Sequence, residues 1–366
     1  MKSMQRNGSL DLVRAMAAFC VVVNHVIEHV YSFNYDSITA LTTSDQKFCF
    51  ALYILGRMGV PLFLLLTGYL LLAKEYDQAK IKHFYTHNFL QLLVVWEIWI
   101  IIYQVFICWF YEEPFDFSVY LLRALFLKNA RLGHTWYIPM IIGMYLFLPF
   151  VSVALNKING KLLAIFLVVS FIYIFVVPGI NLFQNVYNTP TDMLVNSQLD
   201  MSFGGNVYGF YLILGYCFAR YKDKIDKAFK QAIPVVAIGV LGFRMYLTTV
   251  RTQFMFYSIG YPNNVWYVWY DFMLMPICGG CIFLILNKIK LPKLIQRIVT
   301  ELSVCSFGIY LVHYIMVKLS IRYLGDIAHK KLEVVALSFA IYFLAFVIIE
   351  IMSLIPHLGY IFMKKK

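Results

Sequence analysis

Long apolar runs recur along this chain and are separated by short polar segments. A helix needs roughly 20 apolar residues to cross the ~30 Å hydrocarbon core of a bilayer. Runs that meet or approach this length lie near residues 10–31, 48–72, 84–110, 135–156, 162–178, 203–219, 231–250, 265–287, 302–319 and 333–354. The pattern predicts an all-α fold, a polytopic integral membrane helical bundle of about ten transmembrane helices. We expect residues 1–366 to form a single membrane domain.

The composition supports this prediction, and the charges orient the chain. Hydrophobic residues make up 61% of the sequence and charged residues 14%, which excludes an ordinary soluble protein. Cytoplasmic loops of membrane proteins are enriched in Lys and Arg. Here 19 of these residues fall in loops on the side of the termini and eight on the other side, so both termini should be cytoplasmic. The same rule accounts for the net charge of +12, and no nucleic-acid partner is expected.

The first span carries two basic residues, Arg14 and His25, with ten residues between them. Eleven steps along a helix return to within about 20° of the start and advance roughly 16 Å, so both side chains lie on one face. An ionisable group at membrane depth is costly and indicates function. Arg14 could bind phosphate through bidentate contacts. Alternatively, it pairs locally with Asp11, three residues earlier on the same face.

His25 is a candidate general base, because the imidazole pKa lies near working pH. Glu28 follows one turn later and could orient the ring; alternatively, His25 only forms hydrogen bonds within the bundle. With His29, these residues also spell H-x-x-E-H, the inverted zinc-protease signature. The sequence offers no convincing third ligand, so we expect no metal site.

Other polar residues lie at membrane depth or at span ends. Arg57 falls in the second span and His313 in the ninth. His134 and Trp136 stand at the start of the fourth span, although a Trp there is also typical of an interfacial aromatic belt. These residues are candidates for a functional site within the helical bundle.

Two further segments lie close to span ends. Lys82 and His83, at the entrance to the third span, could add to an anion site on the inner side or could simply follow the positive-inside rule. Residues 112–133 combine apolar and charged side chains in a pattern that predicts an amphipathic helix at the outer interface.

Four short motifs are distributed over nearly the whole chain. They are Arg14-x10-His25, Gly56-Arg57 through Gly68-Tyr69-Leu70, His134-Thr135-Trp136-Tyr137, and Gly308-Ile309-Tyr310-Leu311-Val312-His313. Together they resemble the motifs of the membrane-bound acyltransferases called acyltransferase family 3, which includes bacterial O-acetyltransferases of surface glycans. The sequence departs from the family pattern at a few positions. Thr67 replaces a Ser, Leu64 replaces a Phe, and Lys82, His83 and His87 stand where arginines are common.

The resemblance implies a multi-pass enzyme of the bacterial cytoplasmic membrane that takes an acyl group from cytosolic acyl-CoA, usually acetyl-CoA. It implies that Arg14 and His25 are essential, with His25 as the base and Arg14 assisting the donor. The acceptor would be a sugar hydroxyl on a glycan or a lipid-linked glycan.

Together, these observations predict a membrane O-acetyltransferase with acetyl-CoA as co-substrate and no permanently bound cofactor. The expected partners are acetyl-CoA, the glycan acceptor and membrane lipid, and the sequence leaves the oligomeric state open. The expected residues are His25, Arg14 and Glu28 for catalysis, Arg14, Lys82 and His83 for acyl-CoA, and Arg57, His134, Trp136 and His313 for the acceptor. The alternative is a transporter or flippase of a glycan intermediate, whose polar residues would line a substrate path.

Overall fold

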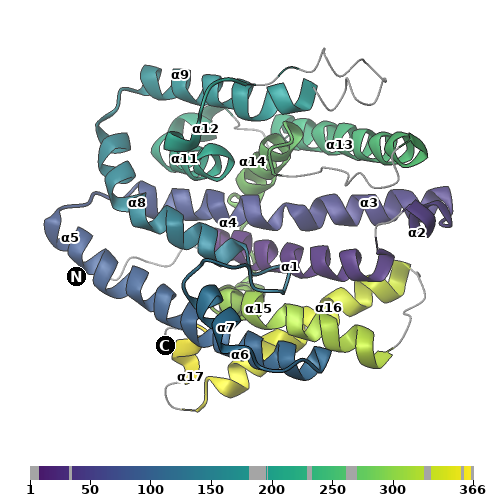
Figure 1. The fold of residues 1–366 in the computed structure, drawn as a ribbon. Helices are drawn as coiled ribbons and strands as arrows, with labels where there is room; N and C mark the ends of the chain where they lie inside the picture. The colour runs from purple at the N-terminus through teal and green to yellow at the C-terminus, as the bar shows by residue number, and fades with distance from the viewer. Residues whose placement is uncertain are drawn as a thin grey trace.

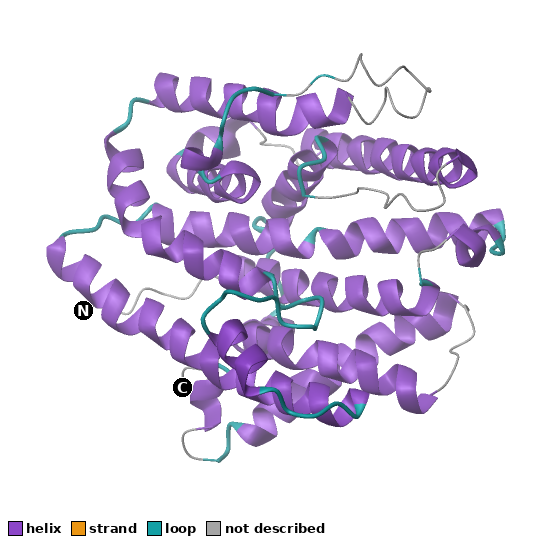
Figure 2. Cartoon of the chain, in the orientation of Figure 1, coloured by secondary structure: helices purple, strands orange, loops and turns teal. Residues whose placement is uncertain are grey.

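A computed structural model describes residues 8–32, 35–180, 195, 197–228, 233–260, 270–324, 331–355 and 358–363. Over these residues the chain is helical and contains no strand (Figure 2). The α-helices are α1 (Gly8–Tyr31), α2 (Tyr35–Thr39), α3 (Thr43–Arg57), α4 (Gly59–Thr67), α5 (Gln78–His83), α6 (Leu90–Tyr111), α7 (Phe117–Ala124), α8 (Tyr137–Lys157), α9 (Gly160–Phe171), α11 (Asn206–Arg220), α12 (Lys222–Ala228), α13 (Ile233–Gly260), α14 (Leu274–Leu286), α15 (Lys293–Leu324), α16 (Lys331–Met352) and α17 (Leu358–Ile361). Short π-helices η1 (Gly68–Leu72), η2 (Phe84–Phe89) and η3 (Ile172–Val176) adjoin α4, α6 and α9, and a 3₁₀ turn η5 (Ser202–Gly204) precedes α11.

Eight helical segments of the described chain are long and apolar enough to cross a membrane. They are Gly8–Tyr31, Thr43–Leu72, Gln78–Tyr111, Tyr137–Lys157, Gly160–Ile180, Ile233–Arg251, Lys293–Leu324 and Lys331–Met352. The all-α, polytopic membrane fold predicted from the sequence is thus confirmed.

The two other predicted spans coincide with shorter helices. The spans expected at 203–219 and 265–287 correspond to α11, with 15 residues, and α14, with 13. A 13-residue helix is only about 20 Å long. The total of ten crossings therefore stays a prediction. Tyr270 to Met273 form a turn, so the eighth predicted span begins too early over these residues.

The interfacial helix expected at 112–133 is much shorter in the structure. Only α7, eight residues long, is helical there, and its Asp116 cap accepts a hydrogen bond from the backbone N–H of Val119 at 3.0 Å. Glu112 and Phe126 have φ angles of 56° and 59°, in the left-handed region, on either side of α7. These two residues turn the backbone out of the helical path.

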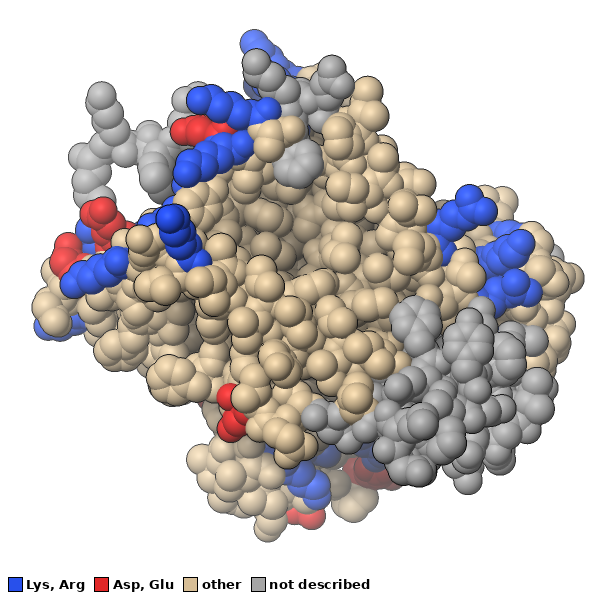
Figure 3. Space-filling view, turned by 90° about the horizontal axis from the view of Figure 1, so that it is seen from above, with Lys and Arg blue, Asp and Glu red and all other residues tan. Residues whose placement is uncertain are grey.

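Both chain termini lie at the same end of the bundle, at the left in Figure 1. We call this the terminal end and the opposite one the far end. On the face shown in Figure 3, most Lys and Arg lie toward the left and right edges, with a smaller charged group at the lower edge, and the band between left and right is mostly uncharged. This distribution suits helices that cross a bilayer with charged ends in water.

Helix α1 lies in the middle of the bundle and packs against α3, α4, α15 and α16. Its small residues Ala17 and Ala18 are buried, which suits close helix packing in a membrane. Near the terminal end, the carboxylate of Asp11 accepts hydrogen bonds from the hydroxyls of Ser303 at 2.7 Å and Thr300 at 3.2 Å. These contacts fix α1 against α15.

Candidate active site

The junction between α3 and α4 positions Arg57, the last residue of α3. Pro61 has no backbone N–H and cannot donate to the carbonyl of Arg57 four residues earlier, so the helix is interrupted at Met58. A Cβ added at Gly56 would lie 2.7 Å from the backbone nitrogen of Asn24. Only glycine permits this close approach of α3 to α1, and it brings Arg57 within reach of the residues that follow Asn24.

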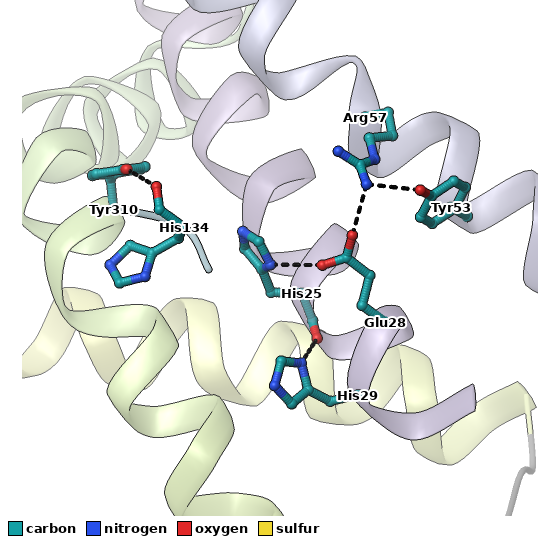
Figure 4. A network of polar contacts seen from close by, with 7 residues as sticks. All are labelled: His25, Glu28, His29, Tyr53, Arg57, His134 and Tyr310. Carbon is teal, nitrogen blue, oxygen red and sulfur yellow. Dashed lines mark hydrogen bonds and ion pairs between the residues drawn. The ribbon is translucent and has the colours of Figure 1, made fainter. Parts of the chain in front are cut away.

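A chain of polar contacts joins α1 to α3 (Figure 4). His25 Nδ1 lies 2.9 Å from one carboxylate oxygen of Glu28, and the other oxygen lies 2.9 Å from Arg57 Nη2. The same Arg57 nitrogen donates to the hydroxyl of Tyr53 at 2.7 Å. The side chains of His25 and Arg57 are only 12% and 11% exposed. At this partly buried site, the positive charge of Arg57 stabilises the carboxylate of Glu28.

This arrangement selects one tautomer of His25. A carboxylate can only accept, so Nδ1 of His25 carries the hydrogen that it donates to Glu28. The neutral ring then has its lone pair on Nε2. A histidine held in this way can take a proton from a hydroxyl while the carboxylate stabilises the imidazolium that forms.

Two more histidines lie beside His25. The ring centroids of His313 and His134 are 5.4 Å and 6.3 Å from that of His25, and 5.3 Å from each other. His134 and His313 are almost completely buried. Helices α1 and α15 and the segment before α8 thus bring together residues that are distant in sequence.

The partners of these two rings fix their lone pairs as well. Tyr103 donates its hydroxyl hydrogen to the Leu311 carbonyl at 2.9 Å, and its oxygen lies 3.1 Å from Nε2 of His134. Nε2 of His134 is therefore the donor, and the lone pair lies on Nδ1. Nδ1 of His313 donates to the Tyr310 carbonyl at 2.6 Å, which leaves its lone pair on Nε2. Neither His134 Nδ1 nor His313 Nε2 has a hydrogen-bond partner among the described residues.

A small cavity of about 30 Å³ lies against His25. Arg57, His134, Trp136 and Tyr270 form other parts of its wall. This volume is large enough to hold a water molecule. A reacting hydroxyl group could occupy this space next to the proposed base.

A second cavity, of about 430 Å³, contains Arg14. Its polar lining includes Thr67, Asn88, Ser303 and Ser306. The π-helices η1 and η2 each contribute to the wall, and such segments are frequent at functional sites. The volume falls within the ~300–1,000 Å³ range of small-molecule sites.

Tyr137 and Tyr310 line both cavities and form the wall between them. Their ring centroids are 5.5 Å apart. The hydroxyl of Tyr310 donates to the backbone carbonyl of His134, which holds one of the two rings in place. Arg14 and His25 therefore lie on opposite sides of a thin aromatic wall.

The structure brings together most of the residues predicted from the sequence. His25, Arg57, His134 and Trp136 share the small cavity. Glu28 and His313 both contact His25, through the carboxylate of Glu28 and the ring of His313. Arg14 lies apart, in the larger cavity.

Lys82 and His83 are placed differently. Both side chains are exposed on α5, and neither is among the described residues that line the Arg14 cavity. The neighbouring segment reaches the cavity through Asn88 instead. His83 stacks on His87 with ring centroids 4.1 Å apart.

Sequence reasoning missed the tyrosines that support the site. Tyr53 contacts Arg57 from four residues earlier on the same helix, a spacing that could have identified it. Tyr103 of α6 fixes His134, which lies in the segment before α8, and no local pattern indicates that contact. Two charged groups outside the spans also pair: hydrogen bonding to Glu113 raises the pKa of Arg131 in the segment after α7.

The comparison with known families decides the class of protein. The family model of the acyltransferase domain, Acyl_transf_3, matches residues 7–354. The chain belongs to acyltransferase family 3. The resemblance seen in the four sequence motifs is thereby confirmed, and the membrane acyltransferase class follows for nearly the whole chain. No curated protein and no solved structure matches the chain.

Proposed function

We propose that this acyltransferase moves an acetyl group from cytosolic acetyl-CoA to a hydroxyl of a cell-surface glycan or its lipid-linked precursor, in the bacterial cytoplasmic membrane. The observation that carries the proposal is the position of the His25–Glu28 pair, one aromatic wall away from a ligand-sized cavity that contains Arg14. A base and a cation on opposite sides of this wall suit a reaction between two substrates that enter from different sides.

The larger cavity supports a CoA donor. The cavity is lined by Arg14 of α1, Ser303 of α15 and Met363 near the C-terminus. All three lie toward the end of the bundle that holds the chain termini, which is expected to face the cytosol. An arginine binds phosphate oxygens in a fixed bidentate geometry. The CoA phosphates would bind at Arg14, and the thioester would reach the wall formed by Tyr137 and Tyr310.

The histidine cluster supports a hydroxyl acceptor. His25, His134 and His313 each present an imidazole lone pair, and the two buried ones have no donor among the described residues. Leaving a buried acceptor without a partner costs about 1–3 kcal/mol. Sugar hydroxyls are donors and would relieve that cost, whereas a purely apolar acceptor would not.

In the proposed reaction, Nε2 of His25 takes the proton of the acceptor hydroxyl as its oxygen attacks the thioester carbonyl carbon. The carbon–sulfur bond then breaks, and the imidazolium returns the proton to the CoA sulfur. The products are an acetyl ester and CoA thiol. Glu28 acts through His25 as a positioning residue, and Arg57 holds Glu28 in place.

Purified protein in detergent provides the test. Radiolabelled acetyl-CoA is mixed with a lipid-linked glycan extract, and both thioester loss and label transfer are measured. We expect transfer by the unmodified protein and at least a hundredfold loss in His25→Ala and Arg14→Ala. Arg297→Ala removes an exposed arginine and should retain activity.

Two results would contradict the proposal. Undiminished transfer by a folded His25→Ala protein would exclude His25 as the base. Movement of a glycan intermediate across vesicles without consumption of acetyl-CoA would instead support the transporter alternative.

A further inference from the structure

A third cavity, of about 180 Å³, adjoins the small cavity at His25. It lies between α6, α7 and the segment that leads into α8, with walls that include Trp96, Arg123, Phe126 and Lys128. Trp136 lines both this cavity and the small one, so a single indole separates them. We call the third cavity the Trp96 pocket.

The walls of the Trp96 pocket combine aromatic faces with positive charge. Trp96 and Phe126 are nearly parallel, with ring centroids 6.4 Å apart and an interplanar angle of 13°. Arg123 donates to two neutral acceptors, the side-chain oxygen of Gln104 and the carbonyl of Asn129. Arg131, further along the same segment, is instead bound to the carboxylate of Glu113. The pocket therefore presents a guanidinium whose hydrogen-bonding partners here are uncharged.

The electrostatics of Arg123 favour an anion. Burial lowers its pKa, the positive charge of Arg131 lowers it further, and the carboxylates of Glu113 and Asp116 offset this only in part. A guanidinium remains charged under all physiological conditions. A bound anion would offset the repulsion between the positive charges of Arg123 and Arg131.

Trp96 supplies an independent sign that a ligand belongs in the pocket. Its side chain is 2% exposed, and its indole N–H has no hydrogen-bond partner among the described residues. An indole N–H can only donate, and one that is buried usually has a partner. A ligand with an acceptor oxygen would provide that partner.

We propose that the Trp96 pocket is a subsite for an acidic sugar of the acceptor. The sugar ring would lie on the aromatic faces, its carboxylate or phosphate would bind Arg123 and Lys128, and a ring or hydroxyl oxygen would accept from Trp96. The next sugar of the chain would then pass Trp136 and present its hydroxyl to His25. This inference rests on the proposed function, because it assigns the acceptor of that reaction.

Saturation-transfer NMR on the full-length protein in detergent tests the subsite without requiring turnover. The probes are methyl glucuronide, glucose 1-phosphate and the neutral methyl glucoside. The unmodified protein should bind at least one anionic probe at least tenfold more tightly than methyl glucoside. The carboxylate and phosphate probes show which anion the pocket prefers.

Two substitutions and one control locate the binding. Arg123→Gln should weaken the preferred anionic probe at least tenfold and methyl glucoside by less than twofold. Trp96→Phe keeps an aromatic face, removes the N–H, and should weaken all three sugars a fewfold. Arg322→Gln removes an equal charge that bonds the Phe110 carbonyl outside the pocket, and it should bind all probes normally.

Equal binding of charged and neutral sugars, no binding of any probe, or an unchanged preference in Arg123→Gln would overturn the subsite. Acetyl-CoA turnover, measured on the same preparations, tests the proposed function separately. Turnover without a preference for anionic sugars would remove only the subsite. Arg123-dependent binding without turnover would remove only the acetyl transfer.

Discussion

A carboxylate oxygen of Glu28 lies 2.9 Å from Nδ1 of His25, three residues earlier on the same helix. The other oxygen is held by Arg57 of α3, so the carboxylate cannot rotate without breaking an ion pair. Through this contact the packing of two helices sets the tautomer of one imidazole. The position of the base is thus linked to the Gly56 crossing of α1 and α3.

Replacing Glu28 with Gln should abolish most of the activity while preserving the size of the side chain. An amide can donate its N–H₂ to Nδ1 of His25, which would move the ring hydrogen to Nε2 and remove the basic lone pair. We expect the rate of acetyl transfer to fall by about 10²–10⁴-fold, the range of a general base. Single-turnover transfer from radiolabelled acetyl-CoA measures it. Glu113→Gln, outside the site, is the control, and a Glu28→Gln rate within threefold of the unmodified protein would refute the role.

The aromatic wall between the two cavities predicts a separation of binding from transfer. Tyr137→Trp places a larger ring in the wall that the thioester must pass. Acetyl-CoA binding should change by less than threefold, whereas transfer should fall at least tenfold. Equilibrium binding and initial rates measure the two effects, with Tyr173→Trp, at a partly exposed position, as the control. Equal losses in binding and in rate would mean that Tyr137 belongs to the donor site only.

The sequence was sufficient to predict most of the long helices and which polar side chains share one helix face. Apolar runs define long helices because a bilayer leaves the backbone few alternatives. The Arg14 and His25 stripe and the His25–Glu28 spacing follow from helical periodicity alone. The motif resemblance then linked distant residues such as His134 and His313, which the structure brings to one place.

Contacts between different helices could not be predicted from the sequence. The chain has 27 tyrosines, so nothing in the sequence singles out Tyr103 as the partner of His134. Lys82 and His83 are exposed on α5, whereas Asn88 of η2 reaches the cavity. Even on a regular α-helix, Asn88 would lie roughly 120–140° around the axis from either residue. Which of these faces lines the cavity depends on the packing of other helices.

The topology gives a prediction for reporter fusions. With ten crossings and cytoplasmic termini, a fusion after Ala228 at the end of α12 lies in the cytosol, and one after Leu324 at the end of α15 lies outside. Alkaline phosphatase should be active only at the Leu324 position, and green fluorescent protein should fluoresce only after Ala228. If neither α11 nor α14 crosses, the fusion after Ala228 will lie outside. A fusion after Leu286 will still lie in the cytosol, because α13 then crosses in the opposite direction.

The crossing of α11 with the second span predicts a stability difference between two glycines. A Cβ added at Gly68 would lie 1.9 Å from the backbone oxygen of Leu212, whereas one at Gly143 would meet nothing within 4 Å. Gly68 lies in η1 and Gly143 in α8, and at both positions a Gly→Ala change reduces the conformational entropy of the unfolded chain. Gly68→Ala forces α11 away and should destabilise the protein by about 1–3 kcal/mol. Gly143→Ala should be neutral or slightly stabilising. The midpoint of heat-induced loss of the monodisperse peak in detergent compares them, and equal midpoints would show that α11 is not held this closely to Gly68.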